Sequence, residues 1–293
     1  MQPLPPELER RAFSVREAAA AGVPVSHLRR RTLATPFRGV RTPADADDDL
    51  LAMCRAYAAR MPDGHYFSHL TAARLRGLWL PMSYRRGEPL HVTAIDTGRA
   101  PRIPGVVGHH IDEDRSEWSL LSGLRVASSL EAARTLAPTL GVEDLAVVLD
   151  SLRRRSGRLV SEEQLLFMLA KHGGQRGIRR LRAAYSVSRS GADSAMETRL
   201  RRGLVLRGLP EPLVNPVISR PGRRERFGDL VWPRWSVVVE YEGTHHQADR
   251  DTYVDDISRY EELADDWSFV RVTREHVRDF PRIISRIQLA RRQ

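Results

Sequence analysis

A short stretch near the end of the chain, VVVEYEGTHH (residues 237–246), combines residue types that can do chemistry together. Its three valines predict a buried strand, and side chains on a strand alternate between two faces. Glu240 and Glu242 therefore point the same way, and His245 and His246 follow directly. Two like charges on one strand face repel each other, so the arrangement predicts a compensating cation.

Two further acids precede this stretch. Glu197 lies in a predicted helix at 194–210, and Asp229 lies in a predicted strand at 226–232. If that strand and the next one, 235–243, form a hairpin, Asp229 approaches Glu240. Carboxylates without thiolates select Mg²⁺ or Mn²⁺. A metal held by Asp229 and Glu240 can activate water and stabilise charge on a phosphodiester.

Structural interpretations of the same residues stay open. Glu197 follows Ser194 by three residues, which is the spacing of a helix capping box. Arg259 and Arg271 could neutralise Asp229 and Glu240 as ion pairs. Arg259 could instead contact a phosphate.

The pattern of apolar residues in the last hundred positions predicts a helix, three strands, a helix, a strand and a closing helix. The expected ranges are 194–210, 215–219, 226–232, 235–243, 251–266, 267–273 and 280–292.

Several motifs in this order resemble the domain-of-unknown-function family 559. The resemblance rests on Glu197, DLVW (229–232), VVVEYEGTHH (237–246) and RYEELADDWSFVRVT (259–273). Such domains are similar to the very-short-patch-repair endonucleases and belong to the PD-(D/E)xK restriction-endonuclease-like superfamily. The match spans roughly residues 193–293.

The resemblance implies a central mixed sheet flanked by helices and metal-dependent cleavage of DNA. Asp229 and Glu240 match the metal-binding acids, and Glu197 would support a metal-bound water. His245 or His246 resembles the histidine that acts as general acid or base. Glu242 falls where the wider superfamily has its lysine, and residues 193–293 contain no lysine. The zinc site of the repair endonucleases is also absent, because Cys54 is the one cysteine of the chain.

A winged helix-turn-helix is predicted at the other end, within residues 1–48. Ser14 and Glu17 form a capping box for a first helix, Gly22 ends it, and Ser26 can cap a second. The second helix would carry basic side chains, and a basic wing would span 35–43. Helices of this kind enter the major groove while nearby arginines hold phosphates. A solvated basic face on a small helical bundle is the alternative. The candidate DNA-binding residues are Arg29, Arg30, Arg31, Arg38, Arg41 and, farther along, Arg259.

A mixed α/β domain is predicted for residues 49–158, with strands at 90–95 and 105–111 and helices within 128–155. His109 and His110 are adjacent on a strand, so their rings face opposite sides, and we interpret both as structural. We interpret His65 and His69 in the same way, since no acidic partner is near.

A helical connector follows at 159–192, and the endonuclease-like domain is 193–293. Residues 1–190 resemble the AbiEi-type antitoxin region. The combination of this region with a C-terminal domain similar to family 559 resembles many actinobacterial proteins.

Charge is distributed unevenly over the 293 residues. The net charge is +10, and residues 193–293 hold 18 arginines against 17 acids, so the first 192 residues carry +9. This distribution indicates that the N-terminal part meets a polyanion such as double-stranded DNA. No apolar run is long enough to cross a membrane, and the start of the chain lacks the apolar core of a secretory signal. With a single cysteine, these features predict a protein of the reducing cytoplasm.

Two functions follow from these patterns. The first is a Mg²⁺-dependent DNA endonuclease of α/β fold whose winged helix supplies affinity for DNA. The second is a DNA-binding transcriptional regulator or antitoxin-like protein. In that case the nuclease-like domain is a degenerate module for support or dimerisation, and a homodimer is expected.

Overall fold

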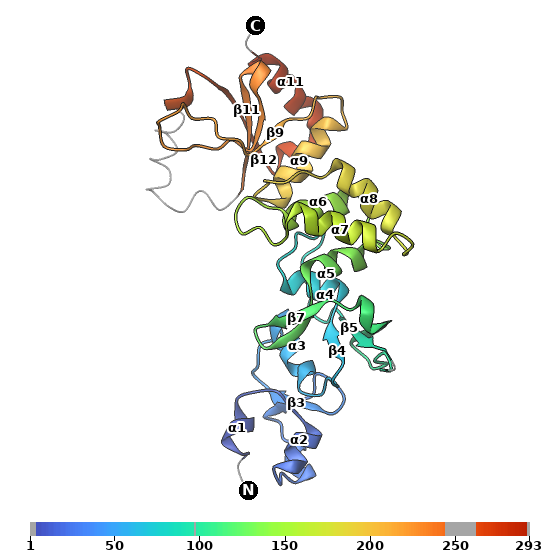
Figure 1. The fold of residues 1–293 in the computed structure, drawn as a ribbon. Helices are drawn as coiled ribbons and strands as arrows, with labels where there is room; N and C mark the ends of the chain where they lie inside the picture. Colours follow the sequence, from blue (N-terminus) through green and yellow to red (C-terminus); the bar gives the residue numbers. More distant parts are fainter. Residues whose placement is uncertain (1–3, 97, 244–261, 292–293) are drawn as a thin grey trace. The chain divides into compact units, whose positions relative to one another are not determined.

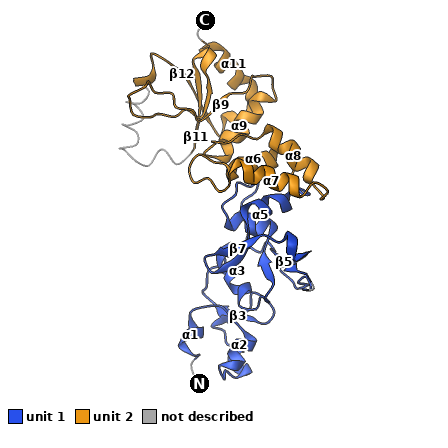
Figure 2. Ribbon diagram, in the orientation of Figure 1, with its two compact units in different colours: residues 1–139 blue, residues 140–293 orange. Residues whose placement is uncertain are grey.

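The computed structural model describes residues 4–96, 98–243 and 262–291 (Figure 1). The chain divides into two compact units, Met1–Thr139 and Leu140–Gln293 (Figure 2). Both units combine helices with mixed or antiparallel sheets, which confirms the predicted α/β class. Residues 140–158, which the sequence analysis assigned to the middle domain, belong to the second unit.

The N-terminal segment forms short helices over a three-stranded antiparallel sheet of order β1-β3-β2. Its elements are α1 (Pro6–Glu9), β1 (Phe13–Ser14), α2 (Val15–Ala20), the 3-10 helix η1 (Val25–Arg29), β2 (Leu33–Ala34) and β3 (Val40–Pro43). Ser14 caps α2 by accepting a hydrogen bond from the Glu17 amide at 3.1 Å, as predicted. Strands β2 and β3 pair as the expected hairpin.

The predicted second α-helix of this segment is wrong. Residues 25–29 form one 3-10 turn that begins after Pro24 without a side-chain cap, so Ser26 is not the cap. Arg30 is already extended, and the Leu33 amide donates to the Arg30 carbonyl at 3.1 Å to begin the hairpin. A segment this short closes with i→i+3 bonds because it has no room for an α-helical ladder.

The rest of the first unit is a five-stranded mixed sheet, order β6-β5-β4-β8-β7, covered by helices. Pairs β5–β6 and β4–β8 are parallel, and the other pairs are antiparallel. The elements are α3 (Leu50–Ala58), β4 (His65–Phe67), α4 (His69–Leu75), β5 (Leu90–Ile95), β6 (Val106–Ile111), the 3-10 helix η2 (Glu113–Arg115), β7 (Trp118–Leu121), β8 (Leu124–Ala127) and α5 (Ser129–Leu136). Cys54 is buried on α3.

Four helices open the second unit: α6 (Val142–Leu152), α7 (Glu162–Lys171), α8 (Ile178–Val187) and α9 (Ala195–Val205). Buried charges fasten α9 to α6. The guanidinium of Arg201 lies 3.2 Å from the Asp150 carboxylate, and both side chains are almost fully buried. Arg202 donates two hydrogen bonds of 2.8 Å to Glu143. These links explain why residues 140–192 cluster with the C-terminal sheet.

A four-stranded mixed sheet, order β12-β11-β10-β9, forms the rest of the second unit. Its elements are β9 (Leu213–Val214), β10 (Leu230–Trp232), the 3-10 helix η3 (Pro233–Trp235), β11 (Val237–Glu242), β12 (Ser268–Thr273), the 3-10 helix η5 (His276–Arg278) and α11 (Phe280–Ala290). Helices α9 and α11 pack on one face, around Val239 and Val272. The other face holds a smaller cluster that includes Val231 and Val238.

Two strand predictions in this unit need correction. The strand expected at 215–219 is reduced to one isolated bridge, Val217 with Phe227, and β9 ends at Val214. Asn215 has a left-handed backbone, φ 46°, which turns the chain out of the sheet. The strand expected at 226–232 begins only at Leu230. Most of the helix expected at 251–266 lies outside the described residues.

Across the three described ranges, no helix has the length and apolar character needed to cross a membrane.

Candidate active site

Asp229, the residue before β10, and Glu240 of β11 lie at one end of the sheet. Val238 lies in the smaller apolar cluster, whereas Val237 and Val239 face α9 and α11. Strand alternation therefore places Glu240 and Glu242 on the face of Val238. The antiparallel register pairs Leu230 with Val239, and continuing it by one residue puts Asp229 opposite Glu240. The predicted approach of these two acids is thus supported by the register.

Backbone contacts hold Asp229 in this position. The Asp229 carboxylate accepts a hydrogen bond of 2.7 Å from the backbone N–H of Tyr241. Tyr241 directly follows Glu240. Glu240 itself is 6% exposed. A buried carboxylate requires compensation by a cation or by hydrogen-bond donors. The pair therefore combines a buried carboxylate, Glu240, with a half-buried one, Asp229, and both offer oxygen donor atoms.

Arg271 supplies positive charge beside these acids. In the parallel register of β11 and β12, Arg271 lies opposite Glu240. Its guanidinium forms an ion pair with Glu242, and both side chains are partly exposed. The alternative interpretation expected Arg271 to form an ion pair with Asp229 or Glu240. This ion pair joins Arg271 to Glu242. A surface pair of this kind contributes little to stability.

Asn215 links Glu197, at the start of α9, to the backbone of Asp229. The Glu197 amide donates to Ser194 Oγ at 3.1 Å, so the predicted cap at the start of α9 is present. One oxygen of its carboxylate accepts from the Asp193 amide at 2.9 Å and from Asn215 Nδ2 at 2.7 Å. Burial raises the pKa of the Glu197 carboxyl, although these hydrogen bonds oppose the rise. The backbone N–H of Asn215 donates in turn to the backbone carbonyl of Asp229 at 3.0 Å.

The sequence analysis missed Asn215. Its left-handed backbone and its two hydrogen bonds tie the start of α9 to the start of β10. The signal available in the sequence was the dipeptide Asn215-Pro216, because Asn before Pro favours turns and Asn tolerates a positive φ.

Other predicted site residues are not brought together by the described structure. His245, His246 and Arg259 lie outside the described residues. Within the part of the chain that is described, the carboxylates do not form a group of three ligand atoms close enough to share an ion. Mg²⁺ is commonly held by one or two carboxylates and several waters. Asp229 and Glu240 offer two such carboxylates.

The candidate DNA-binding arginines differ in exposure. Arg29, Arg31 and Arg38 are exposed, whereas Arg30 and Arg41 are half-buried. Arg41 donates to the carbonyls of Leu28 at 2.8 Å and Val40 at 2.9 Å. Arg41 therefore fastens η1 to β3, whereas Arg29, Arg31 and Arg38 are exposed to solvent.

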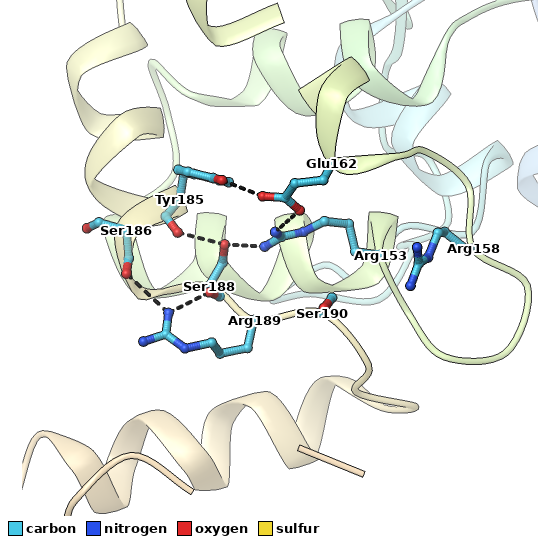
Figure 3. Close-up of a pocket in the computed structure, with 8 residues that line it drawn as sticks. All are labelled: Arg153, Arg158, Glu162, Tyr185, Ser186, Ser188, Arg189 and Ser190. Carbon is cyan, nitrogen blue, oxygen red and sulfur yellow. Dashed lines mark hydrogen bonds and ion pairs between the residues drawn. The ribbon is translucent and has the colours of Figure 1, made fainter. Parts of the chain in front are cut away.

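A polar pocket of about 530 Å³ lies elsewhere in the second unit (Figure 3). It is lined by Arg153, Arg158, Glu162, Tyr185, Ser186, Ser188, Arg189 and Ser190. Arg153 donates to Glu162 at 2.6 Å and also bonds Ser188 Oγ. Arg189 donates to the carbonyls of Ser186 and Ser188. The hydrogen bonds of Arg153 join the end of α6 to α7 and to the residue after α8.

The chain is thus an α/β protein with two carboxylates at the end of a mixed sheet. No family model matches it. Two proteins of Mycobacterium tuberculosis, Uncharacterized protein MT2308 (strain CDC 1551 / Oshkosh) and Uncharacterized protein Rv2248 (strain ATCC 25618 / H37Rv), are each 28% identical over 163 residues, 55% of this chain. The chain spans 58% of the length of each of these curated relatives.

Among solved structures, the crystal structure of the RV2827C protein from Mycobacterium tuberculosis is similar over 71% of this chain and 79% of that chain. The TM-score is 0.39 and the sequence identity 17%. A likeness at this level carries no argument about the fold or function of this chain.

Proposed function

We propose that this protein is a metal-dependent DNA endonuclease with an N-terminal DNA-binding part. The observation that carries the proposal is the register of β10 and β11, which continues to bring Asp229 opposite the buried Glu240. Glu197 and Asn215 connect the same position to the start of α9. This order of acids agrees with the resemblance to the repair endonucleases.

The protein's own groups prepare the site. Asp229 and Glu240 would hold Mg²⁺ or Mn²⁺ through carboxylate oxygens, and the bound ion would supply an activated water and stabilise charge on the phosphodiester. The Tyr241 amide fixes the orientation of Asp229. Asn215 fixes the Glu197 carboxylate through a hydrogen bond of 2.7 Å. In the resemblance to the repair endonucleases, Glu197 would support a metal-bound water. His245 or His246 would transfer the proton, an assignment that rests on sequence alone.

Arg271 offers a partial replacement for the superfamily lysine. It lies opposite Glu240 and pairs with Glu242, the residue that stands at the lysine position of the resemblance. A guanidinium stays protonated at any ordinary pH. Arg271 can therefore offset negative charge on a phosphate, but it cannot act as a general base.

The test is cleavage of supercoiled plasmid and of short duplexes in Mg²⁺ and then in Mn²⁺. We expect the native protein to cut and Glu240→Gln to lose at least 100-fold in rate, the size of effect that removal of one charge-stabilising group typically has. Glu225→Gln is the matched control, because Glu225 is an exposed acid of the same unit. It should cut like the native protein.

Contaminating nuclease is the main alternative explanation of any cleavage. Equal cutting by the native protein and by Glu240→Gln, purified identically, would mean that the activity does not come from this site. No cutting in either metal would remove the enzyme proposal for duplex DNA.

A regulator without nuclease activity is the second candidate, and a specific observation favours it. Arg271, which lies opposite Glu240 in the sheet, forms a surface ion pair with Glu242 and is thus partly neutralised. In this case Arg29, Arg31 and Arg38 would bind an operator, and the second unit would support the fold or form a homodimer. Steep salt dependence of DNA binding without cleavage would favour this candidate.

A further inference from the structure

Three half-buried histidines of the first unit lie together: His69 on α4, His91 on β5 and His109 on β6. One ring nitrogen from each lies within 4.8 Å of the others. In the described ranges of the chain, this is the one group of three or more metal-ligating side chains so close together. The sequence analysis interpreted His69 and His109 as structural and did not consider His91.

The sheet positions two of these histidines. Strands β5 and β6 are parallel, with His91 opposite Val107 and Thr93 opposite His109. Since alternate residues share a face, His91 and His109 lie diagonally on the same side of the sheet. His91 Nδ1 is 2.9 Å from His109 Nε2. His110, the next residue on β6, is exposed and bonds the Asp96 carbonyl instead.

The start of α4 supplies the third histidine. His69 has a left-handed backbone, φ 49°, which costs a non-glycine residue about 1 kcal/mol or more. Its ring stacks on that of His109, with centroids 3.5 Å apart, and its Nδ1 is 3.0 Å from Ser68 Oγ. The Ser68 amide also donates to the His91 carbonyl at 2.9 Å. Strained residues of this kind concentrate at functional sites.

Burial favours the neutral form of these imidazoles. Burial lowers the pKa of His69 to about 3 and that of His109 to about 4, and it also lowers the pKa of His91. Neighbouring histidines add to the shift of His69 and His109. A neutral imidazole presents a lone pair, which is the form that binds a metal.

We propose that His69, His91 and His109 bind one divalent transition-metal ion, with Zn²⁺ the best fit. Imidazole nitrogens suit Zn²⁺ and its neighbours in the first row, whereas Mg²⁺ requires oxygen. Two nitrogens on a tetrahedral zinc ion lie about 3.3 Å apart for bonds of about 2.0–2.1 Å. The His91–His109 separation of 2.9 Å is close to this value.

The stacked rings must adjust when the ion binds. His69 and His109 are within 14° of parallel, so the His69 ring has to turn about its side-chain torsions to direct a nitrogen at the shared ion. Three protein ligands leave a fourth position for water or another ligand. The site is separate from the carboxylates of the second unit and does not depend on the proposed nuclease.

The experiment is titration of the chelator-treated full-length protein with Co²⁺ and with Zn²⁺, followed by visible absorption for Co²⁺ and by calorimetry for Zn²⁺. We expect one equivalent of Co²⁺ to give the absorption bands of a tetrahedral site, which distinguishes it from Co²⁺ held by carboxylates and water. His91→Gln and His109→Gln should each weaken binding by ~100-fold or more, since even outer-shell changes cost 10–100-fold.

Three controls separate this site from other ligands. His110→Gln changes the neighbouring residue of β6 and should keep native affinity. Asp229→Asn with Glu240→Gln should keep it too, and so should the double variant His245→Gln and His246→Gln. Loss of binding in any of these controls, or native binding in His91→Gln or His109→Gln, would overturn the proposal.

A measurement on the native protein covers the case in which a variant fails to fold. X-ray absorption of the zinc-loaded chain should show three nitrogen neighbours with the multiple scattering of imidazole at about 2.0–2.1 Å. A shell of oxygen atoms alone, or no bound zinc after dialysis at micromolar concentration, would contradict the site.

Discussion

Asp150 couples the stability of the second unit to pH. Its carboxylate is fully buried and accepts hydrogen bonds from the Arg189 amide at 2.7 Å and Thr198 Oγ1 at 2.9 Å. Burial is the largest effect and raises its pKa from 3.8 to about 6, although Arg201 opposes the rise. The folded protein therefore keeps a proton between pH 4 and 6 that the unfolded chain has released.

The free energy of unfolding should consequently fall as the pH rises from about 4 to about 6, and this contribution should stay constant above pH 6. A shift of two units corresponds to about 3 kcal/mol. Asp150→Asn removes the titration, so its stability should vary less with pH in this window. Urea denaturation at half-unit pH steps measures the difference. Asp144→Asn, a partly exposed acid on the same helix, should keep the native pH dependence; equal pH profiles for native and Asp150→Asn would contradict the argument.

Single residues were predictable where the chemistry lies within one stretch of sequence. The position of Asp229 opposite Glu240 could be predicted, because the two strands are close in sequence and form a hairpin. His91 and Asn215 could not, because their roles depend on partners 18 residues away, His109 and Glu197, in other elements. Such contacts arise from sheet register and from left-handed turns, which residue types indicate only weakly.

At the scale of the element, β6 depends on a glycine. A Cβ added at Gly108 would lie 2.2 Å from the carbonyl oxygen and 2.8 Å from the nitrogen of Pro101. Both are backbone atoms, so the loop and the strand would have to separate. Glycine inside a strand often marks such a close backbone approach.

Gly108→Ala should therefore destabilise the first unit by about 1–3 kcal/mol, the usual cost of overpacking. Hydrogen exchange of the β5 and β6 amides measures this locally, since two units need not unfold together. Weaker Zn²⁺ binding should accompany it, because His109 is the next residue. Gly174→Ala is the control: a Cβ there meets no atom within 4 Å, and exchange in β5 and β6 should be unchanged. Native exchange in Gly108→Ala would show that the loop yields without cost.

Periodicity decided which elements could be predicted. The strands predicted at 90–95 and 235–243 have clear apolar patterns and appear as β5 and, shortened to 237–242, β11. The second helix of the N-terminal segment and the strand at 215–219 failed for a different reason. Pro24 and the hairpin that follows Arg30 leave one turn for the helix, and the left-handed Asn215 ends β9. Local chain reversals overrode the propensities in both cases.

At the scale of the whole molecule, the charge distribution allows the salt dependence of DNA binding to be predicted. The first 192 residues carry +9 of the net +10, and three exposed arginines, Arg29, Arg31 and Arg38, lie on or beside η1 and the β2–β3 hairpin. Each phosphate neutralised by a cation adds about 0.9 to the slope of log affinity against log salt. The number of phosphates that these three side chains contact can therefore be measured from the change in this slope when they are replaced.

Replacing Arg29, Arg31 and Arg38 together by alanine should lower the salt slope of duplex binding by about 2–3. The matched control replaces Arg176, Arg179 and Arg180, three exposed arginines of the second unit, and so removes the same charge. Fluorescence anisotropy of Glu240→Gln between 50 and 200 mM salt, about the range over which such contacts are resolved, measures binding without cleavage. If both triple variants lose the same slope, binding follows overall charge, and η1 with its hairpin is not a specific DNA-binding surface. A loss confined to the first variant would assign the phosphate contacts to that surface for the nuclease and the regulator alike, so that cleavage alone decides between them.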